Sequence, residues 1–218
     1  MKQMKRSLLT PLATVAGLAF IGGVMLVATQ ANSDPVGRHY DAYNRVLTIG
    51  LVLVALTAVW MSVRVKRLSL AGARAIQAVA IGSGLMLVGN VLEFWGSLLT
   101  GSETQKTAER LGHADAFWGS DIGWFAFLIG AIVLTVALIV VARAARRWGA
   151  TRSQRWAIGT SGVMQSAATG LWVVSPIAAA IPAAAFAFGW LSLATIVDRV
   201  EEPIAVPADP PDAATVLP

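Results

Sequence analysis

The sequence contains no cysteine in its 218 residues. Disulfide bonds, thiolate metal sites, iron–sulfur clusters and cysteine nucleophiles are therefore excluded, whichever compartment the loops face. Charge is also scarce, because Asp, Glu, Lys and Arg make up only 13% of the chain. A soluble domain typically carries about 25% of such residues. The composition therefore argues against a water-soluble globular protein.

Apolar residues are abundant, at 56% of the chain, and they gather into long blocks. Runs of about 20 apolar residues predict helices that cross the hydrocarbon core of a bilayer. Backbone groups in lipid must bond within their own segment, so runs of this length favour helices over the shorter strands of a barrel. We expect an all-α, polytopic transmembrane helix bundle over residues 1–200. The six predicted spans are 8–29, 46–63, 75–99, 122–141, 157–174 and 177–197.

Two details of this division stay open. The apolar stretch from 157 to 197 is too long for one crossing, and Ser175 with Pro176 predicts a turn that divides it. The first span, with its basic start, also fits a secretory signal cleaved near Ala31. Cleavage would leave five spans and the rest of the arrangement unchanged. The run is longer than a usual signal core, which favours a retained anchor.

Basic residues fall mainly on one side of the predicted bundle. With the N-terminus in the cytoplasm, thirteen Lys and Arg residues lie inside and four lie outside. The positive-inside rule therefore predicts a protein of the cell membrane with both termini in the cytoplasm. Residues 201–218 are rich in proline and contain four acidic residues. This composition predicts a disordered cytoplasmic tail.

Glu93 is the only acidic residue inside a predicted span. A charged group at membrane depth is costly, and such residues usually face a bundle interior or a wet cavity. Asn90 and Ser97 lie three residues before and four residues after it, on or near the same helical face. Gln165 lies near the middle of the most polar span after that of Glu93. We therefore predict an outward-facing polar pocket, with Glu93, Asn90, Gln165 and Ser97 as candidates.

Both histidines map to the outer side of the membrane. His39 and His113, with Asp115 and Asp121, would supply nitrogen and oxygen ligands suited to zinc, manganese or iron. Their spacing matches no metal motif, and solvated histidines with Asp121 as a helix cap are the alternative. Haem held between the two histidines is a narrower version of the metal hypothesis. We expect no resident cofactor and keep a divalent metal at these four residues as the alternative.

Small residues spaced four apart predict faces where helices pack closely in lipid. Alanine and glycine are common enough here for some of these spacings to arise by chance. The predicted contact faces are Gly162 with Ser166 and Gly170, Ala78 with Gly82, and Ala126 with Gly130.

Three hypotheses about function remain from the sequence. The first is permeation of a small solute, proton or cation through the Glu93 pocket. The second is an accessory or assembly protein whose polar residues only pack helices, and the third is a membrane enzyme with a metal on its outer side. The chain has no nucleotide-binding loop and no nucleic-acid-binding pattern. The expected partners are the lipid bilayer and, as a further hypothesis, a second copy of the chain, and we expect a protein that is not an enzyme.

Overall fold

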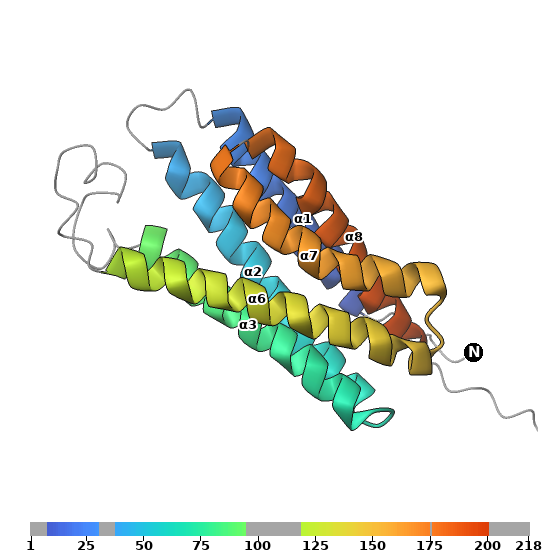
Figure 1. Ribbon diagram of the computed structural model, residues 1–218. Helices are drawn as coiled ribbons and strands as arrows, with labels where there is room; N and C mark the ends of the chain where they lie inside the picture. The colour runs from blue at the N-terminus through green and yellow to red at the C-terminus, as the bar shows by residue number, and fades with distance from the viewer. Residues whose placement is uncertain (1–7, 31–37, 95–118, 175, 201–218) are drawn as a thin grey trace, which may run out of the picture.

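The computed structural model describes residues 8–30, 38–94, 119–174 and 176–200 (Figure 1). Within these ranges the chain is 94% helical and has no strand, which confirms the all-helical fold class. Six long helices and one 3₁₀ turn follow one another along the described ranges. They are α1 (Leu9–Gln30), α2 (Arg38–Val65), α3 (Leu70–Phe94), α6 (Gly119–Ala144), η2 (Ala145–Trp148), α7 (Arg152–Val174) and α8 (Pro176–Val200).

The helices pack in the order in which they follow along the chain. Each long helix contacts the next one, and α8 contacts both α7 and α1, so the helices form a closed ring. The start of α1, the turn between α2 and α3, the turn after α6 and the end of α8 all lie at the same end of the bundle (Figure 1). We call this end the basic end, because it carries Lys66, Arg67, Arg74, Arg143, Arg146, Arg147, Arg152 and Arg199.

Polar caps fix the helix ends at the basic end. The backbone N–H of Gly72 donates to Ser69 Oγ over 3.1 Å, so Ser69 caps the start of α3. At the start of α7, the N–H of Thr151 donates to Gln154 Oε1 over 3.0 Å, and the N–H of Gln154 donates to Thr151 Oγ1 over 3.3 Å. This reciprocal pair is a capping box. Gly149 follows η2 with φ of 78°, a left-handed conformation that favours glycine.

The last long apolar stretch is divided into two helices where the sequence predicted a turn. Helix α7 ends at Val174 and α8 begins at Pro176, while residue 175 lies outside the described ranges. Proline suits the first position of a helix, because the N–H it lacks would have no partner inside the helix. Pro182 lies within α8.

The surface of the bundle is apolar on every long helix. Among the described residues, four segments are long and apolar enough to cross a membrane: Val46–Val65, Leu70–Leu92, Gly123–Trp148 and Ala178–Val200. The described part of α1 has a shorter apolar segment, Leu9–Gly23. The exposed large apolar residues include Val15, Leu18, Ile49, Leu56, Ile81, Val88, Ile129, Ile132, Val163, Leu171, Ile181 and Phe188. Such a surface suits lipid and does not suit water.

Glycines form the contact between α3 and α6. A Cβ atom added at Gly82 would lie 2.8 Å from the carbonyl oxygen of Gly130, and one added at Gly130 would lie 2.6 Å from the carbonyl oxygen of Gly82. A Cβ atom at Gly89 would lie 2.4 Å from the carbonyl oxygen of Gly123. The backbones therefore approach too closely for any side chain, as in other membrane helix pairs with small residues at their interface. This confirms Gly82 and Gly130 as members of a contact face.

Candidate functional site

One face of α3 is fully buried and becomes polar toward the end of the helix. Ile76, Val79, Ser83, Met86 and Asn90 each have 0% of their surface exposed. Successive members are separated by three or four residues, so they lie on one side of the helix. We call these five residues the α3 interior stripe. Its first two members are aliphatic and its last is a carboxamide, so polar character rises away from the basic end.

Asn90 joins α3 to α2. Its Nδ2 atom donates a hydrogen bond to Oγ1 of Thr48 over 2.9 Å. A buried amide needs such a partner, because an unmet donor inside a bundle costs free energy. The sequence predicted Asn90 as a pocket residue, and the structure places it inside the bundle with a helix partner.

Gln165 reaches the same stripe from α7. The residue is fully buried, and its Nε2 atom donates to the sulfur of Met86 over 3.5 Å. Met86 precedes Asn90 by four residues, which is about one helical turn. The predicted candidate Gln165 therefore contacts α3 one turn before the other candidate, Asn90. We call Thr48, Met86, Asn90 and Gln165 the interior polar layer.

A second polar link joins α6 to α7. Thr135 Oγ1 donates to the carbonyl oxygen of Gly162 over 2.8 Å and lies 2.7 Å from Ser166 Oγ. Because the single hydroxyl proton of Thr135 goes to the carbonyl, Ser166 is the donor in the second bond. Gly162 and Ser166 both contact α6, which confirms them as members of a contact face. The surroundings of Gly170 lie outside the described part of the structure.

Ser83 differs from the other buried hydroxyls. Thr57 Oγ1 donates to the carbonyl oxygen of Leu53 over 2.6 Å, and Ser161 Oγ donates to that of Ile158 over 2.7 Å. Ser83 Oγ is fully buried and has no hydrogen-bond partner among the described residues. Most buried polar groups in proteins are hydrogen-bonded. Ser83 is therefore a polar member of the α3 interior stripe that makes no hydrogen bond to a described neighbour.

The side chains of two predicted pocket residues are not among the described ones. Glu93 belongs to α3, three residues after Asn90, but its side chain is not among the described ones. Ser97 lies outside the described ranges. Whether these two side chains join Asn90 and Gln165 therefore stays a prediction.

The side chains of the four predicted metal ligands also lie outside the described part of the structure. His39 lies in α2 and Asp121 in α6, but the description does not extend to their side chains. His113 and Asp115 fall outside the described ranges. In the part of the chain that is described, no group of three or more His, Asp or Glu residues could hold a metal ion. The metal hypothesis stays untested.

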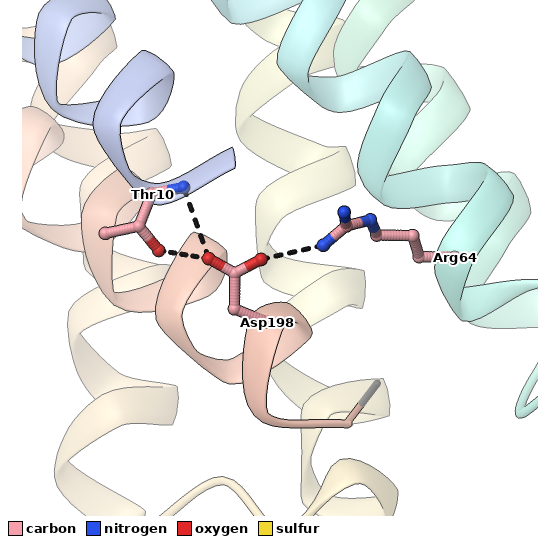
Figure 2. A network of polar contacts seen from close by, with 3 residues as sticks. All are labelled: Thr10, Arg64 and Asp198. Atoms are coloured by element: carbon pink, nitrogen blue, oxygen red, sulfur yellow. Dashed lines mark hydrogen bonds and ion pairs between the residues drawn. The ribbon is translucent and has the colours of Figure 1, made fainter. Parts of the chain in front are cut away.

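A charged network at the basic end ties three helices together (Figure 2). Arg64 Nη1 donates to Asp198 Oδ1 over 2.7 Å, and the side chains of Arg64 and Asp198 are only 12% and 18% exposed. The other oxygen, Oδ2, accepts the backbone N–H of Thr10 over 3.2 Å and also the Thr10 hydroxyl. Thr10 is in the first turn of α1, where helix N–H groups favour a negative charge. The guanidinium of Arg64 also lies 4.9 Å from the ring centre of Trp60.

Sequence reasoning missed this network. Arg64 and Asp198 each follow directly after a predicted span on the inner side, and Arg64 served only as one of the charges that set orientation. The available signal was an acidic residue at the inner end of a span, where most neighbouring charges are basic. Its partners could not be named, because that requires knowing that α8 contacts both α1 and α2.

No protein family, curated protein or solved structure matches this chain.

Proposed function

We propose that this chain is an integral membrane protein of six spans in the cell membrane, with both termini in the cytoplasm. The distribution of polar and apolar residues on helix α7 supports this best. Its polar residues Ser161 and Gln165 are fully buried, whereas Trp156, Val163 and Leu171 are 64%, 49% and 40% exposed. A helix on the surface of a soluble protein shows the opposite arrangement, with its apolar face toward the core.

The hydroxyl groups of the outer helix surfaces are also suited to lipid. Thr160 of α7 is exposed, and its Oγ1 donates to the carbonyl oxygen of Trp156 over 2.7 Å. Ser192 of α8 makes the same kind of bond to Phe188 over 2.9 Å. Polar groups in a bilayer need such internal partners. The 22 residues of α1 and 23 residues of α7 extend about 33 to 35 Å, enough to cross a hydrocarbon core of about 30 Å.

We infer that the bundle contains an outward-facing site for a proton or small cation centred on Glu93. Two fully buried carboxamides carry this inference: Asn90 of α3, and Gln165 of α7, which donates to Met86 one turn before Asn90. The α3 interior stripe advances by three and four residues, and the next step after Asn90 reaches position 93, which is still within the helix. The interior polar layer would then form the floor of a site in which Glu93 is the ionisable group. Permeation of a proton, cation or small solute is the function that this arrangement supports.

Proton flux into liposomes tests this role. Purified protein is reconstituted into vesicles that contain a pH-sensitive dye, and a pH or cation gradient is applied. We expect a flux above that of empty vesicles, its loss in Glu93→Gln, and its retention in Glu93→Asp. The unfolding midpoint of each variant in detergent serves as the control for folding. Equal flux in the wild type and Glu93→Gln would rule out the role of Glu93.

The second candidate is an accessory or assembly protein whose polar residues only pack helices. The bonds from Asn90 to Thr48 and from Ser166 to Thr135 favour it, because each joins two helices. In this case Glu93→Gln changes the unfolding midpoint, and the wild type shows no flux above that of empty vesicles. The two measurements together therefore separate the two functions.

A further inference from the structure

The basic end has a large excess of positive charge. Eight Lys and Arg side chains there are exposed. The described carboxylate at this end, that of Asp198, already accepts hydrogen bonds from Arg64 and Thr10 through both of its oxygens. Among the described residues, no acidic side chain is therefore left to neutralise the exposed cations of this end.

Packing gathers part of this charge at one corner. The ring of Trp148 lies so close to Gly72 that a Cβ atom there would be 2.3 Å from Trp148 Cζ2. Trp148 is only 8% exposed, so it fills the space between η2 and the first turn of α3. The exposed Arg146 and Arg147 precede Trp148 directly in η2, so they lie on the segment that contacts the start of α3 just after the turn between α2 and α3. That turn contributes two more exposed cations, and we call Lys66, Arg67, Arg146 and Arg147 the basic corner.

Exposed leucines flank these cations. Leu68 and Leu70 are each 52% exposed; Leu68 follows Arg67 directly, and Leu70 comes two residues later. Cations beside exposed apolar side chains suit the boundary between lipid headgroups and acyl chains, where long basic side chains extend toward the headgroups. A soluble polyanion would pair with the cations but leave the leucines in water. The composition of the corner therefore favours a lipid surface.

We propose that the basic corner binds the phosphate groups of anionic lipids in the inner leaflet. This inference rests on the proposed membrane insertion, and its assignment to the inner leaflet rests on the proposed orientation of the termini. It is independent of Glu93. Arginine matches phosphate oxygens with two parallel N–H groups, and lysine adds a compact positive charge. Each cation near an anionic membrane surface strengthens binding by about fivefold.

Counting bound lipids by native mass spectrometry tests the proposal. The full-length protein in a neutral detergent is titrated with a short-chain phosphatidylglycerol and, separately, with the matching phosphatidylcholine. We expect preference for phosphatidylglycerol and at least about tenfold weaker binding in Lys66→Gln/Arg67→Gln and in Arg146→Gln/Arg147→Gln. The control, Arg38→Gln/Arg45→Gln, removes the same number of charges from the first two turns of α2, at the opposite end of the bundle. The control should bind like the wild type.

Several outcomes would overturn the proposal. Equal binding of the two lipids would do so, as would equal losses in the corner variants and the control. Displacement of the lipid by the same concentration of inorganic phosphate would assign the corner to a free phosphate. Binding of a peptide of residues 201–218 in place of the lipid would assign it to the acidic tail of the chain. Should a glutamine variant fail to fold, Arg146→Lys/Arg147→Lys keeps the charge and must retain the lipid preference.

Because detergent exposes both ends of the bundle, the lipid count does not depend on orientation. A wrong assignment of the termini would therefore leave this result unchanged, whereas loss of the lipid preference would leave the six-span arrangement intact.

Discussion

Substitution of Gly89 by alanine is the sharpest test of the contact between α3 and α6. The added Cβ atom would lie 2.4 Å from the carbonyl oxygen of Gly123 and 2.6 Å from the backbone nitrogen of Phe127. Both atoms belong to the backbone of α6, so no side chain can move to relieve the contact. Since non-bonded atoms prefer separations of about 3.5 Å or more, the two helices must separate by about 1 Å.

This separation weakens the whole interface. Overpacking costs about 1 to 3 kcal/mol, and a gap of about 1 Å forfeits up to about half of the dispersion energy of each contact that opens. We therefore expect Gly89→Ala to lower the free energy of unfolding by about 3 kcal/mol. Reversible unfolding of the full-length protein in mixed micelles, followed by circular dichroism, measures this value.

Gly84→Ala is the matched control, because it makes the same chemical change on the same helix. A Cβ atom at Gly84 meets nothing within 4 Å. Alanine also has the higher helix propensity, by up to about 1 kcal/mol in water. We expect Gly84→Ala to be neutral or slightly stabilising. Unfolding of the Gly84 and Gly89 variants at the same denaturant concentration would refute the close approach of α3 and α6.

Three further predictions concern other residues. Asp198→Asn should lower the free energy of unfolding by about 2 kcal/mol, because it removes one charge of a largely buried ion pair. A double-mutant cycle with Arg64→Gln that shows no coupling energy would contradict this ion pair. Ser83→Ala should change the free energy of unfolding by less than about 0.5 kcal/mol, whereas Asn90→Ala should lower it by about 1 to 2 kcal/mol. Only Asn90 loses a hydrogen bond to a neighbouring helix. Denaturation of both variants measures the difference. Elemental analysis of the purified protein should find no stoichiometric zinc, manganese or iron, and one metal per chain that is lost in His113→Ala would contradict this expectation.

Local patterns predict much of this fold. Apolar runs and the Ser175–Pro176 pair give the division into helices, because hydrophobic length and proline geometry act within a few residues. Small residues at four-residue spacing predict the contact between Gly82 and Gly130, because close backbone approach requires the absence of side chains. Four described helices have the length and hydropathy of a membrane span, as the apolar runs of the sequence predict.

Other features depend on contacts that no local pattern encodes. Arg64 and Asp198 are 134 residues apart in the chain, and they meet only because α8 returns to α1 around the ring. The contact of Gln165 with Met86 likewise depends on the rotation of α7 against α3. Helical spacing placed Asn90 on a polar face, but it could not name Thr48 as its partner. Charge and polarity thus predict that a side chain needs a partner, while only the packing of helices decides which one.

The number of spans is tested most directly by labelling single cysteines in cells. The natural chain has no cysteine, so Ser153→Cys and Ser175→Cys each create a unique site, at the two ends of α7. With a membrane-impermeant maleimide applied from outside, we expect Ser175→Cys to react and Ser153→Cys to react only after the membrane is opened. Reaction of both sites from the same side would show that α7 does not cross the membrane and would contradict the six-span arrangement.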